Sequence, residues 1–302
     1  MYGPGGFYVV ELGDIIVDRY IIVHKLGYGG YASVWLVLDT TESQYVTLKI
    51  LSADSSKKSK ELEVLQRLGQ LNVDLAEHFI CPLLNHFQVQ GINGVHTCLI
   101  MPWAGLRVME DLERSEWYTN EERIATARYY TRQLAHGLAL LHSVGIVHGD
   151  LTVSNILMQL DTLPTYSLDD LYSHIGEPDK IVGTYWAPQT SRGFDYLVEA
   201  ADLSQLPTKK AILIADFGEA FLIQDPPLHG LGTPLAFAPP EGFLLRHASP
   251  ASDIWALGCL AFHWWSHSRL FSYYSNDDIL RWMEILSKPS QTYLSQHEAY
   301  HK

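Results

Sequence analysis

Cysteine is scarce in this sequence. The chain has three cysteines, Cys81, Cys98 and Cys259, which lie far apart and form no C-x-x-C pair. Disulfide frameworks and structural zinc sites need several cysteines, or cysteines and histidines, at close and regular spacing. The sequence therefore indicates neither a disulfide-stapled module nor a zinc site.

Positive charge and long apolar runs are also in short supply. Lys and Arg number 21 against 34 Asp and Glu, a net charge of −13, whereas proteins that bind a phosphate backbone carry excess basic residues along a groove. The longest apolar run, 254–265, is too short to cross a bilayer, and residues 1–14 lack the basic start of a secretory signal. We therefore expect a soluble, intracellular monomer in the cytoplasm, the nucleus or both, with no nucleic-acid or membrane partner.

What is present is the composition of a folded protein, with 47% hydrophobic and 18% charged residues. β-Branched and aromatic residues dominate the first third, and apolar residues at helical spacing follow later. The expected elements are three strands in 20–51, an amphipathic helix at 55–71, a strand pair in 79–101, a turn at 102–105 and a long helix at 121–143. Strands first and helices later predict an α+β fold with two lobes.

We expect an insertion within the second lobe. Residues 159–208 are rich in proline and polar residues, and so long a loop-like stretch inside a compact domain carries short elements of its own. Within it, Ser167 and Gly176 are placed to begin and end one helix. The expected division is an N-terminal extension at 1–19, a first lobe at 20–101, a hinge at 102–105 and a second lobe at 106–302.

A glycine-rich segment, LGYGGYASV at 26–34, lies between two predicted strands. Glycine lets backbone amides approach phosphate groups because no Cβ stands in the way. In isolation, a plain hairpin turn explains the segment equally well. The candidate nucleotide-binding residues are Leu26, Gly27, Gly29, Gly30 and Val34.

Lys49 is a cation among apolar neighbours on the third predicted strand. A lysine there can contact the α- and β-phosphates and pair with an acidic residue on the following helix. Glu61 is the first candidate for that partner, and Glu63 is the alternative. Taken alone, Lys49 also fits a side chain that extends from an edge strand to solvent.

Two further segments carry carboxylates after apolar strands. In IVHGDLTVSNILM, residues 146–158, Asp150 can accept a proton from an attacking hydroxyl, and Asn155 can reach a magnesium ion from the same loop. In ILIADFG, residues 212–218, Asp216 adds a hard oxygen ligand for magnesium. The segments GTPLAFAPPE at 232–241 and SDIWALG at 252–258 complete an order that chance rarely gives.

In this order of motifs, residues 20–287 resemble the eukaryotic protein kinase superfamily. More narrowly, the chain resembles the fungal, CMGC-type group of kinases related to SR-protein kinases, on the segments GDIIVDRYIIVHKLGYGGYASVWL, DDLYSHIGEP, YLVEAADLS and SDIWALGCLAF. The resemblance implies a bilobal fold and a Ser/Thr-specific enzyme that uses ATP and Mg²⁺. In better-known members of that group the protein substrates are Arg/Ser-rich splicing factors.

The resemblance also implies roles for individual residues. Asp150 would be the catalytic base, Lys49 and Glu61 would orient the phosphates, and Asn155 and Asp216 would hold the metal. The adenine would lie against Thr47, Met101, Trp103 and Ala104.

Several positions depart from the kinase pattern. Gly149 replaces the arginine that pairs with an activation-loop phosphate, and Thr152 replaces a lysine near the γ-phosphate. Thr47 replaces a small alanine, and Pro102 removes a hinge donor. After an expected helix at 277–287 the chain stops sooner than the resemblance implies, as a truncated gene product would.

These departures keep two alternatives open. One is a pseudokinase or scaffold that binds nucleotide or partners without efficient turnover. The other is a small-molecule kinase, whose family also favours H-G-D but lacks the segments at 232–241 and 252–258.

Overall fold

A computed structural model describes residues 3–114, 119–161, 166–181, 196–228, 230–244 and 247–271. The expected helix at 277–287 lies outside these residues. The chain divides into two compact units: the first comprises 1–62, 81–106 and 159–210, and the second comprises 63–80, 107–158 and 211–302.

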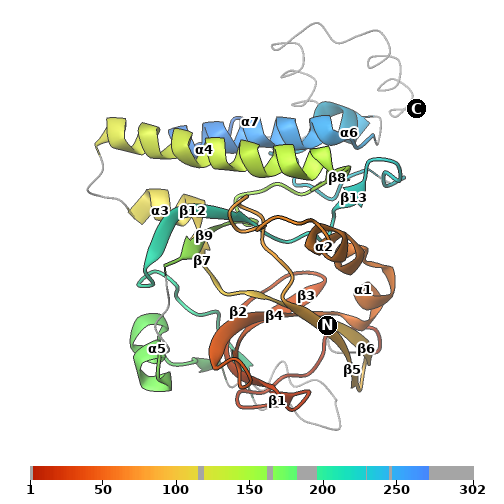
Figure 1. Cartoon of the computed structure of the whole chain (residues 1–302), viewed down its shortest axis with the longest axis vertical. Helices are drawn as coiled ribbons and strands as arrows, with labels where there is room; N and C mark the ends of the chain where they lie inside the picture. Colours follow the sequence, from red (N-terminus) through yellow and green to blue (C-terminus); the bar gives the residue numbers. More distant parts are fainter. Residues whose placement is uncertain are drawn as a thin grey trace, which may run out of the picture. The chain divides into compact units, whose positions relative to one another are not determined.

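The first unit is built on a six-stranded sheet of order β1-β2-β3-β4-β6-β5 in which neighbouring strands are antiparallel (Figure 1). The three strands expected in 20–51 are confirmed, because polar and glycine-rich breaks separate the β-branched runs as hairpin turns require. The strands are β1 Ile15–Ile16, β2 Tyr20–Tyr28, β3 Ala32–Asp39, β4 Gln44–Leu51, β5 Asn85–Gly91 and β6 Gly94–Pro102.

The insertion packs on this sheet. Helix α5, Leu168–Ile175, begins where the Ser167 hydroxyl accepts a hydrogen bond from the Asp170 amide at 3.2 Å and ends at Gly176, so both predicted caps are confirmed. The buried Leu171 and Ile175 of α5 share an apolar cluster with Val23, Leu36, Trp103, Leu160 and Leu206. Residues 159–210 therefore belong by packing to the first unit, while the predicted lobe boundaries stay predictions. The remaining insertion strands are β10 Lys180–Ile181 and β11 Leu197–Val198.

The prediction of one helix over 55–71 was wrong. The structure has two helices, α1 Ala53–Lys58 and α2 Glu61–Gly69. Ser59 separates them because its backbone is extended, with φ −68° and ψ 136°, and its hydroxyl accepts a hydrogen bond from the Glu61 amide at 3.1 Å. Helical spacing of leucines could not show this break, since the leucines at 62, 65 and 68 all lie in α2 and the polar α1 carries no such pattern.

Two other expected boundaries were also wrong. The strand pair expected from residue 79 begins at Asn85, and strand β7, Ala104–Arg107, starts inside the expected turn at 102–105. β7 is an edge strand of a small sheet of order β12-β9-β7, and edge strands of that length carry little sequence signal. The other strands of that sheet are β9 Ile156–Leu160 and β12 Thr208–Ile214.

The second unit is mainly helical. Its long helix α4, Asn120–Ser143, begins in a capping box between Thr119 and Glu122 and lies beside α7, Pro250–Ser266 (Figure 1). The predicted long helix is thus confirmed, and with it the predicted α+β order of strands first and helices later. The remaining elements of this unit are α3 Val108–Arg114, β8 Ile146–Val147, β13 Phe221–Leu222 and α6 Pro240–Leu244.

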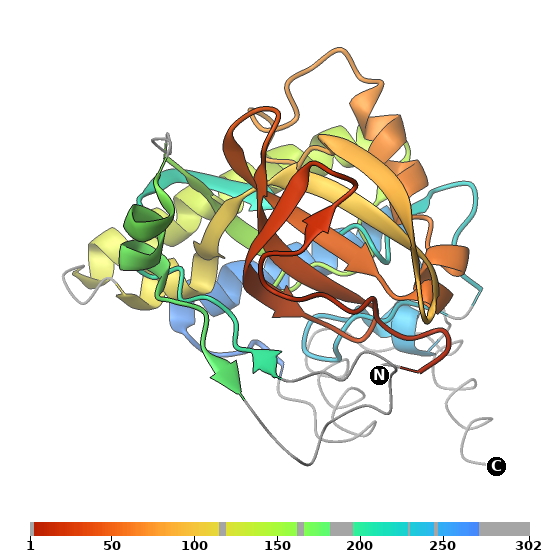
Figure 2. The same ribbon diagram turned by 90° about the horizontal axis from the view of Figure 1, so that it is seen from below.

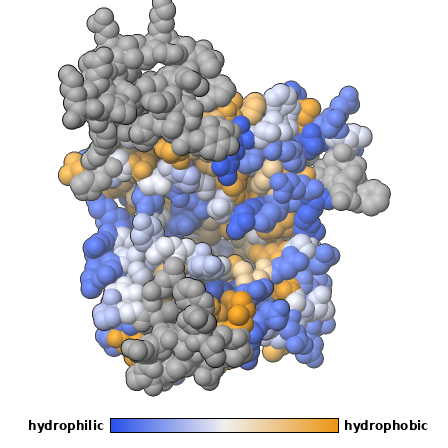
Figure 3. Space-filling model, turned by 180° about the vertical axis from the view of Figure 1, so that it is seen from behind, coloured by the Kyte–Doolittle hydropathy of each residue, from blue (hydrophilic) through white to orange (hydrophobic). Residues whose placement is uncertain are grey.

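Hydrophilic residues cover most of the coloured surface in the view of Figure 3, and hydrophobic residues form separate groups between them. Within the described part of the chain, no helix is both long enough and apolar enough to cross a membrane. Many large apolar side chains are buried in the cores, while others, such as Tyr31 and Leu228, are exposed.

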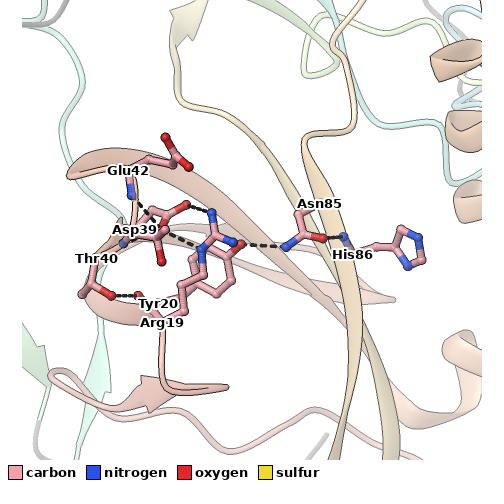
Figure 4. A network of polar contacts seen from close by, with 8 residues as sticks. Arg19, Tyr20, Asp39, Thr40, Glu42, Asn85 and His86 are labelled. Carbon is pink, nitrogen blue, oxygen red and sulfur yellow. Dashed lines mark hydrogen bonds and ion pairs between the residues drawn. The ribbon is translucent and has the colours of Figure 1, made fainter.

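An ion pair fixes the start of the sheet (Figure 4). Arg19 donates from Nε to Asp39 Oδ1 at 2.8 Å and from Nη2 to Oδ2 at 2.7 Å. Asp39 also accepts a hydrogen bond from the Thr41 amide at 3.0 Å, which closes the turn between β3 and β4. The Arg19 hydrogen bonds hold the pKa of the Asp39 carboxyl below its ordinary value, and the turn amides act in the same direction.

This lowered pKa predicts a pH dependence of stability. A carboxyl with a lower pKa in the folded state stabilises the fold above its unfolded pKa of about 3.9, and this contribution is lost as pH falls through the folded pKa. We expect Asp39→Asn to lower the urea unfolding midpoint clearly at pH 7, and we expect the difference from the unsubstituted chain to shrink below about pH 4. Glu110→Gln, which changes an exposed pair with Arg107, is the control and should change little at either pH. An Asp39→Asn deficit that persists undiminished at pH 3 would contradict the prediction.

Candidate active site

The candidate nucleotide-binding residues of the first unit lie in rows across neighbouring strands. Gly27 on β2 pairs with Val34 on β3, and Val34 pairs with Lys49 on β4. In the next row Thr47 pairs with Met101 on β6. Antiparallel register thus brings residues from four separate strands into one small area of the sheet.

The backbone of the glycine-rich turn is uncrowded at its glycines. A Cβ added to Gly27, Gly29 or Gly30 would meet no atom within 4 Å. The turn is closed by a hydrogen bond from the Gly29 amide to the Ala32 carbonyl at 2.9 Å. Open backbone at successive glycines is what a phosphate group needs to approach main-chain amides.

Lys49 and Glu61 form a buried ion pair. Lys49 Nζ lies 2.6 Å from Glu61 Oε1, and the two side chains are only 9% and 1% exposed. Of the two predicted partners, Glu61 therefore pairs with Lys49, whereas Glu63 is exposed to solvent. Removing one member of such a pair leaves an uncompensated buried charge, so substitution of either side chain alone would be costly.

The expected adenine-contacting residues are mostly buried. Thr47, Met101 and Ala104 are each less than a tenth exposed. The Trp103 side chain belongs to the apolar cluster of the insertion, and Leu26 packs against that cluster. We therefore expect Trp103 to meet a nucleotide through its backbone rather than its ring.

The catalytic-loop candidates lie in the second unit, directly after β8. The His148 ring is fully buried; its Nε2 lies 3.1 Å from the Ala215 carbonyl, and its Nδ1 accepts a hydrogen bond from the Asp150 amide at 3.3 Å. A carbonyl can only accept and an amide can only donate, so the proton resides on Nε2. His148 also contacts Phe217, with ring centroids 5.0 Å apart, and so joins the loop to the segment that contains Asp216.

Asp150 and Asn155 are joined directly. Asn155 Nδ2 donates to the Asp150 backbone carbonyl at 2.8 Å and to Asp150 Oδ2 at 3.0 Å. The other carboxylate oxygen, Asp150 Oδ1, is buried and has no hydrogen-bond partner among the described residues. A buried acceptor without a partner is costly, so its retention indicates a place for a donor such as a hydroxyl.

The electrostatic surroundings of Asp150 favour proton acceptance. Burial raises the pKa of its carboxyl above the ordinary value, the hydrogen bond from Asn155 acts against this rise, and the charge of Asp216 adds to it. A raised pKa makes a carboxylate a stronger base.

Asp216 follows β12 in a left-handed backbone conformation, with φ +62°. Its Oδ1 accepts a hydrogen bond from the Gly218 amide at 3.2 Å. The neighbouring Ala215 amide donates to the Asn155 carbonyl at 2.9 Å. The two predicted metal ligands, Asn155 and Asp216, therefore lie on segments that are hydrogen-bonded to each other.

Asp253 is a functional residue to which the sequence gave no role. Its carboxylate, on α7 and 1% exposed, accepts hydrogen bonds from the amides of His148 at 2.9 Å and Gly149 at 3.0 Å. Its Oδ2 also lies 2.8 Å from Nε2 of His142. One buried side chain thus fixes the backbone just before Asp150. An acidic residue inside an apolar helix was the available signal, since such a group needs partners.

The backbone conformation and the surroundings of Gly149 both disfavour any other residue at this position. Its φ is +77°, and an added Cβ would lie 2.7 Å from the Glu219 carbonyl oxygen. Its own carbonyl accepts a hydrogen bond from the buried Thr233 hydroxyl at 2.6 Å. The kinase pattern has an arginine at this position. Its Cβ would lie where the Glu219 main chain leaves no room.

Thr152 also has a structural task. Its hydroxyl accepts a hydrogen bond from the Ser154 amide at 3.3 Å, and its carbonyl accepts one from the Asn155 amide at 3.1 Å. Thr152 thereby shapes the turn that presents Asn155, although it supplies no positive charge.

The donor set fits magnesium and a nucleotide. Asn155 uses its amide nitrogen on Asp150, so the amide oxygen remains for a metal, and Asp216 adds a carboxylate. Magnesium takes one or two protein carboxylate-type ligands together with phosphates and water. No group of three or more His, Cys, Asp or Glu side chains suited to a metal ion occurs in the described ranges.

Comparison with known proteins places the chain in a family. The family model described as "Protein kinase domain" matches residues 20–299, most of the chain. The curated relatives include SRSF protein kinase 3 of Mus musculus, 29% identical over 162 residues that cover 52% of this chain and 28% of that protein. The serine/threonine-protein kinase SKY1 of Saccharomyces cerevisiae is 30% identical over 53% of this chain and 22% of its own length.

A third relative aligns over almost the whole chain. The serine/threonine-protein kinase SRPK of Physarum polycephalum is 27% identical over 98% of this chain and 73% of its own length. The predicted resemblance to the SR-protein-kinase group is thereby confirmed. The chain spans less than a third of the length of the mouse and yeast relatives.

Proposed function

Because the chain belongs to the protein kinase domain family, we propose that it is a serine/threonine kinase that transfers the γ-phosphoryl group of ATP to protein hydroxyls. The observation that carries this proposal is the Asp150 carboxylate. One of its oxygens is held by Asn155, and the other is buried without a partner among the described residues. This is the arrangement that a base needs to receive a substrate hydroxyl.

Each residue has a defined task in this proposal. Asp150 Oδ1 accepts the hydroxyl proton, so that the oxygen can attack phosphorus in line with the departing diphosphate. Lys49, held by Glu61, neutralises and orients phosphate oxygens, and the open glycine turn donates main-chain hydrogen bonds to them. Magnesium, when bound by Asn155 and Asp216, supplies positive charge to the phosphate oxygens.

The geometry supports an active enzyme over a pseudokinase. The Lys49–Glu61 ion pair and the Asp150–Asn155 hydrogen bond are both formed. The buried contact of Thr233 with Gly149 and the carboxylate of Asp253 fix the catalytic loop without an arginine that reads a phosphate. We therefore propose that activity needs no activating phosphorylation, and that Thr152 lowers the rate because it supplies no charge to the transferring group.

For the substrate, we propose Arg/Ser-rich proteins of the splicing-factor type. The relatives named SRSF protein kinase and SRPK motivate this class. The net charge of −13 supports it, since an acidic protein attracts basic partners and repels acidic ones. A kinase of such proteins would act in the cytoplasm, the nucleus or both, and we propose that it acts as a monomer.

The test is a comparison of two peptides. Magnesium-dependent ATP turnover is measured on an Arg/Ser-rich peptide and on a neutral serine peptide of equal length, with Asp150→Asn as the blank. We expect kcat/KM to be about tenfold or more higher for the basic peptide at low salt, and we expect the ratio to fall as ionic strength rises.

Other outcomes have defined meanings. Equal rates on both peptides would contradict the substrate class but keep the kinase. Nucleotide binding without turnover would establish the pseudokinase. Faster transfer to aminoglycosides or choline than to either peptide would establish a small-molecule kinase.

A further inference from the structure

The N-terminal segment, residues 3–14, is part of the first unit and runs past the turn between β5 and β6 (Figure 2). Asn93 in that turn makes two hydrogen bonds to the segment. Asn93 Nδ2 donates to the Phe7 carbonyl at 2.7 Å, and the Asn93 carbonyl accepts a hydrogen bond from the Gly5 amide at 2.9 Å. Phe7 and Val10 are buried, so the segment is packed as well as hydrogen-bonded.

The segment approaches the turn as closely as atoms allow. A Cβ on Gly91 would lie 2.8 Å from the Tyr8 ring, and a Cβ on Gly94 would lie 2.8 Å from the Cβ of Ala53. Real Cβ contacts are longer than this, so glycine at 91 is a condition for the packing of the segment, and glycine at 94 is a condition for the packing of α1. The Tyr8 ring also meets the buried His96 edge-on, with centroids 5.2 Å apart.

From this turn the segment reaches the start of α1. The Ala53 amide donates to the Gly6 carbonyl at 3.0 Å, and the Asp54 amide donates to the Gly5 carbonyl at 2.9 Å. First-turn amides have no partner within their own helix, so the segment supplies partners that a short helix such as α1 otherwise lacks.

The residues just before α1 connect to both nucleotide-binding features. Leu51 ends β4, the strand that carries Lys49, and its carbonyl lies 2.9 Å from Nδ1 of His96. The next amide, that of Ser52, donates to the Tyr31 carbonyl of the glycine-rich turn at 2.8 Å. The contacts of the N-terminal segment therefore converge on the junction at 51–54.

The same junction leads to Glu61. Helix α1 is fixed to β6 by a hydrogen bond from the Thr97 amide to the Ser56 hydroxyl at 2.8 Å. Its C-cap, Ser59, accepts the Glu61 amide, and Glu61 begins α2 and pairs with Lys49. Only Ser59 and Lys60 lie between the two helices. A displacement of α1 is thus passed to Glu61 through these two residues.

We propose that the N-terminal segment positions the Lys49–Glu61 ion pair, with Tyr8 and Asn93 as positioning residues that touch neither nucleotide nor substrate. This inference rests on the proposed function, because it assigns the segment a part in phosphate orientation. The segment holds α1 against the β5–β6 turn, and α1 in turn sets where Glu61 meets Lys49. If the contacts between the segment and the β5–β6 turn are lost, each catalytic side chain is still present, but the position of Glu61 relative to Lys49 is less well fixed.

The test uses the full chain and three single substitutions. Gly91→Ala forces the Tyr8 ring away, Asn93→Ala removes the side-chain hydrogen bond to Phe7, and Gly3→Ala is the matched control because a Cβ there meets nothing within 4 Å. We expect Gly91→Ala and Asn93→Ala to lower kcat/KM for ATP about five- to tenfold, with KM for the peptide unchanged. Gly3→Ala should equal the unsubstituted chain.

A double-substitution cycle separates positioning from general stability. Glu61→Gln alone should lower kcat/KM for ATP strongly, and in that background Gly91→Ala should have less than about a twofold further effect, because both changes act on one ion pair. Multiplied effects of the two substitutions would overturn the proposal and leave the segment a purely stabilising role. Asn93→Ala gives the same cycle if Gly91→Ala does not fold.

Failure of the proposed function is distinguishable from failure of this inference. If the unsubstituted chain shows no turnover, the dissociation constant of a non-hydrolysable ATP analogue takes the place of kcat/KM in the same cycle. Hydrogen exchange at the Ala53, Asp54 and Glu61 amides is measured in parallel. Unchanged exchange at the Glu61 amide in both Gly91→Ala and Asn93→Ala would overturn the inference, whether or not the chain is an active kinase.

Discussion

Replacement of Asp150 by asparagine is expected to lower kcat by about 10³-fold, within the range that a positioned general base contributes. Asparagine keeps the shape of the side chain but cannot accept a proton from the substrate hydroxyl. It would also turn the Oδ1 position, which lacks a partner among the described residues, into a different hydrogen-bonding group. KM for ATP should change little, because the residues expected to contact the adenine and those of the glycine-rich turn lie in the other unit.

The measurement is steady-state phosphorylation of the Arg/Ser-rich peptide by the two proteins at saturating ATP. Asp169→Asn, at an exposed position of α5, is the matched control and should keep full activity. Urea unfolding shows whether the substituted protein is folded. A folded Asp150→Asn protein within tenfold of the original kcat would remove Asp150 from the role of base.

Replacement of Gly149 is expected to have the largest effect on stability. Gly145 and Gly149 share a φ of +77°, but a Cβ at 145 meets nothing within 4 Å, whereas a Cβ at 149 lies 2.7 Å from the Glu219 carbonyl. Gly145→Ala should therefore cost only the backbone strain of about 1–2 kcal/mol. Gly149→Ala should cost about 1–3 kcal/mol more, because main chain has to move.

The paired urea unfolding curves of Gly145→Ala and Gly149→Ala measure this difference directly. Gly149→Arg, which restores the residue of the kinase pattern, should be no more stable than Gly149→Ala. We also expect it to lose activity rather than gain control by phosphorylation, since Thr233 and Asp253 hold the Gly149 backbone where it is. Equal unfolding midpoints for the two alanine variants would show that the Glu219 carbonyl yields without cost.

Local signals account for what the sequence predicted well. Strand breaks at glycine and polar residues, and the caps Ser167 and Gly176, are properties of a few neighbouring residues. The pairing of Lys49 with Glu61 rather than Glu63 followed from helical spacing, because Glu61 shares a face with apolar residues. The break at Ser59 could not be seen, because the leucines at 62, 65 and 68 all lie after it and mark only the second helix.

Long-range contacts account for what the sequence could not give. Asp253 accepts hydrogen bonds from residues about a hundred positions away, and the sequence around Asp253 does not indicate which residues these are. The close approach of Tyr8 to Gly91 and the packing of the insertion on the sheet likewise depend on the folded chain. Such contacts are set by packing, which a single sequence does not display.

The burial of the three cysteines makes their thiols unreactive toward alkylating reagents in the folded protein. Cys81, Cys98 and Cys259 are all buried, and burial raises the pKa of each thiol to about 12. Thiolate is the reactive form, so alkylating dyes at neutral pH should leave the folded protein unlabelled. A cysteine introduced at the exposed Tyr31 position of the glycine-rich turn would then carry the dye alone, and its fluorescence would report directly on that turn as nucleotide enters and leaves.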